Sequence, residues 1–280
     1  MAYKISVIGG INLDIGGRPS DVLRLRDSNI GKISRSAGGV GFNIAKELVK
    51  RGAEISLVSA LGDDPDGGLL MLAARSAGIN ISETLITGNL PTSLYLYVTD
   101  EKGDMYVAIN DMRVTDLLTP EYIMGRMSVI NGGDAIVADA NLRRDTLEYI
   151  AERAKRPVYA DTVSVAKCLK LKGLAVRALK PNMAEASKLT GKSTPEEAAE
   201  VLLGCGIGRV FISLGTDGIY AAENGRSCRV PCPKVVNGNT NGSGDAAMAA
   251  IVLADLDGKD LEETAKAAAD AAAEHIARNE

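Results

Sequence analysis

The sequence predicts an α/β protein in which a parallel sheet is covered by helices on both faces and a small antiparallel sheet projects from the body. Two observations lead to this prediction. Apolar, β-branched runs alternate along the chain with helical stretches, which is the pattern of right-handed βαβ units. Elsewhere, two strand-like runs flank a polar loop that contains a glycine, as in a β-hairpin.

The expected elements follow one another along the chain. Strands are expected at residues 5–8, 55–61, 135–139, 157–161, 174–179 and 210–214. Helices are expected between them at residues 41–51, 67–77, 120–127, 144–154, 183–189 and 196–203. The C-terminal part predicts two helices in succession, at residues 242–256 and 261–277. The sequence shows no repeat or long linker, so we expect a single domain over residues 1–280.

The small sheet is expected to form a lid. Its hairpin lies within residues 92–111, and further short strands are expected within residues 12–36. A flap of this kind, in an enzyme that acts on a small polar substrate, excludes water from the reaction. The sequence therefore predicts a β lid built from two insertions into the α/β body.

Composition argues against several classes of function. The net charge is −4 and the Lys and Arg residues are scattered, so a nucleic-acid polymer is not an expected partner. Aromatic residues make up 4% of the chain and Trp is missing, which leaves few platforms for stacked bases. The apolar stretch at residues 5–8 is too short for a signal peptide or a membrane span. We expect a cytoplasmic protein with a small-molecule substrate and no membrane partner.

Cysteine and histidine content narrows the chemistry. The four cysteines fit no disulfide framework, and the chain offers few further ligands for a zinc site. The single histidine, His275, falls in the last expected helix, where we expect it on the surface. A general base is therefore expected to be a carboxylate.

A turn of small residues precedes one of the C-terminal helices. Gly242, Ser243 and Gly244 lead into an Ala-rich run, and Asp245 belongs to the same turn. Backbone N–H groups at such a helix N-terminus favour an anion, with phosphate as the usual occupant. Asp245 beside a phosphate suits a base that takes a proton from an attacking hydroxyl. The alternative is an N-cap Asp with glycines that serve helix packing.

A second glycine-rich turn opens the first expected helix. Gly38 and Gly39 would let a substrate approach the backbone, and Asn43 offers both a donor and an acceptor. Asn12 and Asp14 follow the first strand, where ligands bind in open α/β sheets. Each residue taken alone also fits ordinary turn chemistry. Together they predict a pocket for a polyol that faces the phosphate site.

Residues 38–43 and 239–245 resemble the two signatures of the ribokinase (PfkB) family of carbohydrate kinases, and they occur in the family's order. Three further elements fit the same family: the Asn12-x-Asp14 pair, the Asn182-x-x-Glu185 element and residues 213–218. The resemblance extends from the first strand to nearly the last helix. It implies a ribokinase-like fold, with a Rossmann-like body and a β lid. It also implies transfer of the γ-phosphoryl group of ATP to a sugar hydroxymethyl group.

The resemblance implies a role for each matching residue. Asp245 would be the catalytic base, and the anion hole would be formed by Gly242, Ser243 and Gly244. Glu185 would hold Mg²⁺ through water. The nucleotide would be lined by Asn182, Ser213, Gly215, Thr216 and Gly218. The sugar would be held by Asn12, Asp14, Gly38, Gly39 and Asn43.

Within the family, the branch of pseudouridine kinases is the most similar, on residues 27–29, 108–112, 118–120, 139–142 and 161–164. This implies pseudouridine as acceptor, its 5′-phosphate as product, and Asn110 among the groups under the lid. Asn110 could instead cap the lid hairpin. The alternative within the family is a ribokinase or another nucleoside or sugar kinase. The alternative from another class is a non-catalytic nucleoside-binding protein.

Two departures from the family pattern bear on these expectations. Phe42 stands where the branch usually has Arg, which is expected to alter the sugar or base pocket. Asn239 stands where many ribokinases have an Asp near a monovalent-cation site, which weakens the expectation that K⁺ is a cofactor. Because exposed lids in this family often pair, a homodimer through the lid is expected.

Overall fold

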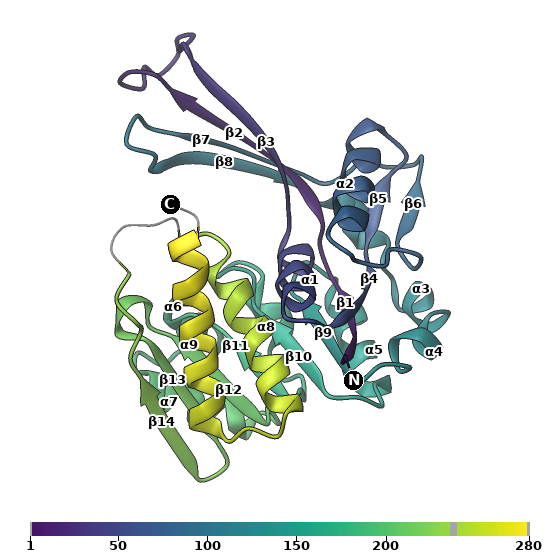
Figure 1. Cartoon of the computed structure of the whole chain (residues 1–280), viewed down its shortest axis with the longest axis vertical. Helices are drawn as coiled ribbons and strands as arrows, with labels where there is room; N and C mark the ends of the chain where they lie inside the picture. Colours follow the sequence, from purple (N-terminus) through teal and green to yellow (C-terminus); the bar gives the residue numbers. More distant parts are fainter. Residues whose placement is uncertain (1, 236–239, 279–280) are drawn as a thin grey trace.

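A computed structural model describes residues 2–235 and 240–278 and contains an eight-stranded sheet in the order β14-β13-β12-β11-β10-β9-β1-β4 (Figure 1). The strands from β12 to β4 run parallel, and β13 is antiparallel to both of its neighbours. Their bounds are β1 Lys4–Ile8, β4 Glu54–Val58, β9 Ala135–Asp139, β10 Val158–Asp161, β11 Ala178–Lys180, β12 Arg209–Ser213, β13 Ile219–Glu223 and β14 Arg226–Val230.

Helices cover both faces of this sheet (Figure 1). One face packs against α1 Val40–Lys50, α2 Pro65–Ser76, α8 Ser243–Leu256 and α9 Leu261–Arg278. The other packs against α3 Pro120–Met124, α4 Met127–Ile130, α5 Arg144–Arg153, α6 Met183–Thr190 and α7 Pro195–Gly204. Three 3₁₀ turns complete the body: η1 Arg113–Leu117, η2 Cys168–Leu171 and η3 Gly215–Asp217.

The central strands are apolar along most of their length because both of their faces are buried. In β9, Val137 belongs to the core under α1 and α8, while Ile136 and Ala138 belong to the core on the opposite face. In β12, Phe211 likewise belongs to the core under α1 and α8, and its neighbour Ile212 belongs to the core on the opposite face. This alternation of buried side chains explains why the strands appear in the sequence as continuous apolar runs.

A second, four-stranded sheet projects from the body in the order β3-β2-β7-β8 (Figure 1). Its strands are β2 Asn12–Pro19, β3 Gly31–Gly38, β7 Leu94–Thr99 and β8 Met105–Asp111. A short parallel pair, β5 Ala60–Gly62 and β6 Leu85–Thr87, lies beside its root. The predicted parallel sheet with helices on both faces and a small separate sheet is therefore confirmed. The small sheet is not antiparallel throughout, as was expected, because β2 pairs with β7 in parallel.

Several element predictions were wrong in detail. The expected strand at residues 55–61 is broken at Ser59, whose hydroxyl donates to the Gly9 carbonyl at 2.6 Å as the chain leaves the central sheet for β5. The strand expected at residues 174–179 begins only at Ala178. The helix expected at residues 120–127 is two short helices, α3 and α4.

The hairpin of β13 and β14 was not among the expected elements. Its turn is the Asn224-Gly225 pair, and Gly225 has φ +75°, a value that glycine adopts without strain. None of the helices in the described part of the chain is both long and apolar enough to cross a membrane.

Candidate active site

Three charged side chains stand in a row at the carboxyl end of the central sheet. Asp139, Asp161 and Lys180 end the neighbouring strands β9, β10 and β11, and the strand register places Asp161 opposite both of the others. Ligands of open α/β sheets bind at this edge. Lys180 Nζ lies 3.2 Å from Asp161 Oδ2, so these two buried groups form an ion pair.

The turn before α8 faces this row. Gly242 has φ +84° and α8 begins at Ser243, so Asp245 falls in the first helical turn. A Cβ atom on Gly244 would lie 3.2 Å from Lys180 Nζ, which shows how closely the turn approaches the lysine. The positive end of the helix dipole and the ammonium group therefore act on the same region of space.

The electrostatic surroundings of Asp245 are unusual for a carboxyl group. Burial raises the pKa of Asp245 to about 8, and the Asp161 carboxylate adds to this shift. Lys180 and a hydrogen bond with Asn43 of α1 act in the opposite direction. For Lys180, burial alone would lower the pKa, but the charges of Asp161 and Asp245 outweigh it and the pKa is raised. A carboxyl that titrates near neutral pH is suited to proton transfer.

Asp139 fixes the turn that follows β1 and lies against the start of α1. Its carboxylate accepts hydrogen bonds from the backbone of Gly10 at 2.9 Å and of Asn141 at 2.8 Å. Burial raises the pKa of Asp139, against the effect of these bonds. A Cβ on Gly41 would lie 3.1 Å from the Asp139 carboxylate and 2.9 Å from the Gly9 backbone. The glycine at position 41 therefore allows α1 to approach the edge of the sheet.

On the side of the second sheet, Asp14 is the central polar group. Asn12 Nδ2 donates to Asp14 Oδ1 at 2.6 Å, and burial raises the pKa of Asp14. A Cβ on Gly38 would lie only 2.1 Å from Asp14 Oδ2, so the carboxylate rests directly against that glycine. The strand register places Asp14, Tyr95 and Asn110 in one row across β2, β7 and β8, and paired residues share a face of a sheet.

Lys46 was not among the predicted site residues, but the charges of both Asp245 and Asp14 act on it. Lys46 of α1 is half-buried, and its pKa is lowered by burial and by Lys50, while the charges of Asp245 and Asp14 act in the opposite direction. Its Nζ lies 4.7 Å from the centroid of the Phe42 ring. Phe42 itself is 2% exposed and belongs to the core, so it supports Lys46 and contributes no polar group to a pocket.

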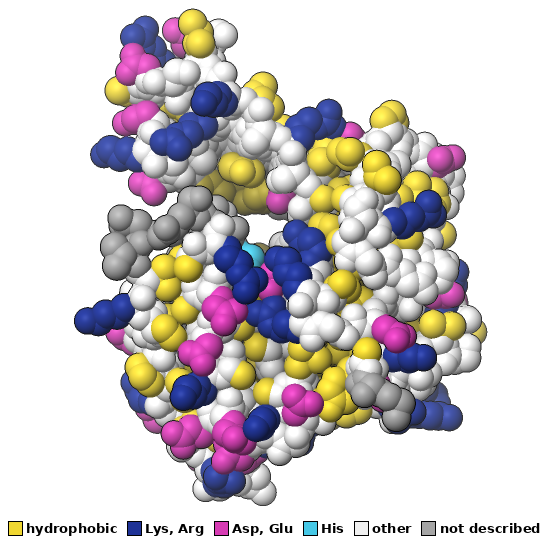
Figure 2. Space-filling model, in the orientation of Figure 1, with side chains coloured by type: hydrophobic (Ala, Val, Ile, Leu, Met, Phe, Trp, Pro, Cys, Tyr) yellow, Lys and Arg dark blue, Asp and Glu magenta, His cyan; other side chains and the backbone are white. Residues whose placement is uncertain are grey.

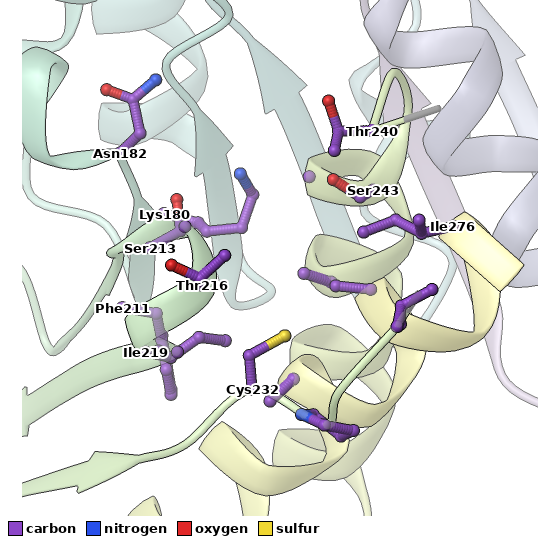
Figure 3. Close-up of a pocket in the computed structure, with 18 of the residues that line it drawn as sticks. Lys180, Asn182, Phe211, Ser213, Thr216, Ile219, Cys232, Thr240, Ser243 and Ile276 are labelled. Carbon is purple, nitrogen blue, oxygen red and sulfur yellow. The ribbon is translucent and has the colours of Figure 1, made fainter. Parts of the chain in front are cut away.

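A cavity of about 750 Å³ opens beside the α8 turn, between β12, α6 and the two C-terminal helices (Figure 3). The polar side chains of Lys180, Asn182, Ser213 and Thr240 lie toward one end of it, and Phe211 and Ile219 lie toward the other. The lining includes the predicted residues Asn182, Ser213, Gly215, Thr216, Gly218, Ser243 and Gly244. Its size and its division into polar and apolar ends suit a small organic ligand that carries an anionic group.

The start of α6 forms one wall of the cavity. Asn182 Oδ1 accepts from the Glu185 backbone at 2.9 Å, and Glu185 Oε2 accepts from the Asn182 backbone at 2.8 Å, which is a capping box. Thr162 Oγ1 also donates to Glu185 Oε2, at 2.6 Å. Glu185 is buried and does not line the cavity. A magnesium ion, which keeps several waters in protein sites, would reach this carboxylate through water.

The structure brings most of the predicted residues to one cleft, and Figure 2 shows the surface hollowed beneath the projecting sheet. Asn110 is exposed and lines a separate cavity of about 530 Å³ together with Asn141 and Lys167. Asn239, on which the K⁺ expectation depends, lies outside the described residues. The prediction missed five polar groups of the site: Lys46, Tyr95, Asp139, Asp161 and Lys180. Asp161 and Lys180 carried a signal, because each ends an expected strand or follows it directly.

Comparisons with known proteins agree with this arrangement. Residues 2–279 match the model of the pfkB family carbohydrate kinases. The chain is 35% identical to pseudouridine kinase from Escherichia coli K12 over 94% of this chain and 87% of that protein. It is 32% identical to the uncharacterized sugar kinase YeiI of the same organism, over 95% and 76% of the two chains.

A solved structure shows the same fold. The carbohydrate kinase from Agrobacterium tumefaciens superposes with a TM-score of 0.86 at 29% identity, over 97% of this chain and 90% of that one. The match covers the central sheet and the second sheet alike, since so little of either chain is left out. This chain therefore belongs to the pfkB family of carbohydrate kinases and is a phosphotransferase that acts on an alcohol group.

Proposed function

We propose that this kinase transfers the γ-phosphoryl group of ATP to the 5′-hydroxymethyl group of pseudouridine. The observation that carries the proposal is the position of Asp245, whose pKa is raised to about 8. It directly follows Ser243 and Gly244, which line a cavity of nucleotide size, and its charge and that of Asp14 act on the same lysine, Lys46. The identity of 35% with a pseudouridine kinase over nearly the whole chain supports the choice of acceptor.

In this proposal Asp245 removes the proton of the acceptor hydroxyl as the hydroxyl attacks phosphorus. The bond from the acceptor oxygen to the γ-phosphorus forms while the bond to the β,γ-bridging oxygen breaks, and ADP leaves. General-base catalysis contributes about 10²- to 10⁴-fold to such a step. The proton has a short way to go, because Asp245 lies in the same turn as the proposed phosphate donors.

The phosphoryl group would be held by the turn of Gly242, Ser243 and Gly244, in which the Ser243 N–H also donates to the Thr240 carbonyl at 3.1 Å, with Lys180 as an additional cation. Phosphoryl transfer depends largely on positioning the reactants and stabilising charge, and hydrogen-bond donors fixed in a helix turn can do both. Mg²⁺, when bound with the nucleotide, would neutralise phosphate charge, and Glu185 would hold it through water. The adenine would occupy the apolar end of the cavity, near Phe211 and Ile219.

On the acceptor side, Asp14 would accept hydrogen bonds from the two ribose hydroxyls, with Asn12 holding its carboxylate in place. Gly38 and Gly39 would let the sugar approach the backbone, and Asn43 would lie between the sugar and Asp245. The uracil would lie under the second sheet, which acts as a lid near Tyr95 and leaves Asn110 toward its edge.

A panel of acceptors tests the proposal. ADP release is measured with pseudouridine, uridine, ribose, adenosine and fructose 6-phosphate, and mass spectrometry locates the phosphate on the product. We expect the highest kcat/KM with pseudouridine, at least about tenfold above uridine, because the C-linked base presents one more N–H group for the protein to bind. If ribose is the best acceptor, the proposed substrate is wrong and the enzyme phosphorylates a free sugar. If nucleosides bind but no ADP is released, the protein is a non-catalytic nucleoside-binding protein.

The second sheet also suggests how the protein assembles. Its outward face carries Ile33, Leu96, Val107 and Ile109, with exposed fractions of 80%, 44%, 50% and 67%. An apolar face of this kind on a soluble chain marks an interaction site. We propose that it pairs with the same face of a second copy. Light scattering should then find a dimer, and Ile109→Lys should give a monomer, whereas Leu72→Lys on α2 should not.

A further inference from the structure

The sequence analysis expected the single histidine, His275, on the surface, but in the structure its side chain is partly buried and has partners. The side chain of His275 is 19% exposed, and its Nε2 lies 3.0 Å from the carbonyl oxygen of Asn241. Its Nδ1 lies 3.5 Å from Glu47 Oε1. In Figure 2 the histidine, drawn in cyan, lies at the hollow below the projecting sheet.

These contacts join three separate segments at the start of the α8 turn. His275 comes from the last turn of α9, Asn241 directly precedes Gly242, and Glu47 lies one helical turn after Asn43 on α1. The ring also lies against the turn itself, because a Cβ on Gly242 would be 2.8 Å from His275 Nε2. Any side chain at position 242 would displace the imidazole.

Glu47 is a well-anchored partner for the ring. Its carboxylate is buried and accepts hydrogen bonds from Lys50, at 2.7 Å, and from Arg51. Burial would raise the pKa of Glu47, but these hydrogen bonds and charges outweigh it and lower the pKa to about 2. The carboxylate is therefore ionised at all physiological pH values and presents a fixed negative charge to the imidazole.

We propose that His275 is a positioning residue for the phosphate-binding turn. The Asn241 carbonyl is an acceptor, so the imidazole nitrogen that faces it, Nε2, donates its N–H to it, and Glu47 Oε1 lies on the Nδ1 side of the ring. This holds the Asn241 carbonyl toward α9 and fixes the turn whose next residues, Ser243 and Gly244, line the cavity. His275 does not line the cavity, whereas its neighbour Ile276 does, so it acts through the turn and not on the ligand.

The inference rests on the proposed use of this turn to bind the phosphates of ATP. Two substitutions separate the hydrogen bond from the packing. His275→Leu fills similar space without a donor, and His275→Gln places an amide N–H near the position of Nε2. Glu274→Gln is the matched control, because this neighbour on α9 is exposed and pairs with Arg278.

We expect His275→Leu to lower kcat and to raise both KM and Kd for ATP. The value of kcat/KM for ATP should fall by about tenfold or more, since misplaced donors cost up to about 10²-fold. The KM for the acceptor should stay near the wild-type value. His275→Gln should recover most of the loss, and Glu274→Gln should match the wild type. Calorimetric titration with ATP and no acceptor gives the Kd, so the test does not depend on knowing the acceptor.

Two results would overturn the inference. The first is a His275→Leu variant with wild-type kcat and wild-type affinity for ATP. The second is equal loss in the Leu and Gln variants with a matching fall in Tm, which would make His275 a packing residue only. If the wild type binds ATP but phosphorylates no acceptor, the proposed function fails, while the Kd comparison still decides the role of His275.

Discussion

The proposed catalytic base, Asp245, should determine how activity depends on pH. A base must be deprotonated to act, and burial together with Asp161 raises the pKa of this group to about 8. We therefore expect kcat/KM for the acceptor to increase as pH rises through about 8 and then to level off. Asp245→Asn should keep the fold and lose roughly 10²- to 10⁴-fold in kcat at the plateau. A folded variant with near-wild-type kcat would rule out Asp245 as the base.

The charge of Asp161 gives a control for that pH profile. Asp161 raises the pKa of Asp245, and it also pairs with Lys180, which lowers it. Asp161→Asn removes the negative charge that raises the pKa of Asp245 and leaves Lys180 without its ion-pair partner, so that Lys180 lowers this pKa further. The midpoint of the profile should therefore move to lower pH. Lys180→Met should move it to higher pH. Shifts in the same direction for both variants would mean that the profile reports another group.

Asp14 makes a prediction about the acceptor. Charge-assisted hydrogen bonds to the two ribose hydroxyls are worth about 1.5–3 kcal/mol each. Asp14→Ala should then reduce kcat/KM for pseudouridine by roughly 10²-fold or more and leave the Kd for ATP almost unchanged. The wild type should use the 2′-deoxy analogue poorly, and the variant should discriminate against it far less. Loss of ATP binding with the ribose preference intact would remove Asp14 from the sugar site.

The residue that caps α6 has two roles, and substitutions can separate them. Asn182 caps α6 through Oδ1 and also lines the cavity. An Asp caps a helix as well as an Asn does, but it places a negative charge beside the proposed phosphates. Asn182→Asp should therefore keep Tm and raise the KM for ATP by roughly tenfold or more.

The matched variant is Asn182→Ala, which removes the cap. Loss of such a cap costs about 1 kcal/mol, so Tm should fall by about 2 °C in a protein of this size. Its effect on the KM for ATP should be smaller than that of the Asp variant. If the two variants ranked alike in both Tm and KM, Asn182 would act through the cap alone.

Local signals decided which elements could be predicted. The buried parallel strands were predictable because burial on both faces demands continuous apolar runs, as in β9. The β13–β14 hairpin also carries a local signal, the Asn224-Gly225 turn. The end of β4 at Val58 was harder to predict from the sequence, because Ser59, where the strand breaks, bonds to Gly9 in a distant segment.

The cleft as a unit depends on relations that no single stretch of sequence contains. The two signatures predicted the turns, since glycine and Asp at fixed spacing are local. The row of Asp139, Asp161 and Lys180 exists only through the register of three strands. The contact of His275 with Asn241 joins residues 34 positions apart in the sequence. Charged groups that tune Asp245 were therefore beyond a prediction based on motifs.

That arrangement has a cost in the stability of the free protein. Asp245 has a pKa of about 8 in the folded state against 3.8 for an ordinary Asp, so folding favours its protonated form. Its contribution to the free energy of unfolding is fully present below about pH 4 and is lost progressively as pH rises through about 8. Asp245→Asn cannot titrate and keeps a polar partner for Asn43. The Tm difference between the variant and the wild type should therefore grow as pH rises from 5 to 8.5.

Calorimetry without ligands at these two pH values measures the difference. Near pH 5 the two proteins should have similar Tm values, and at pH 8.5 the variant should be more stable by at least a few degrees, since about 1 kcal/mol corresponds to about 2 °C at this size. Titrating groups that do not act on Asp245, such as Asp14, are common to both proteins and cancel in the comparison. A difference that stays constant with pH would mean that Asp245 is ionised in the folded protein throughout, and that its chemistry needs no raised pKa.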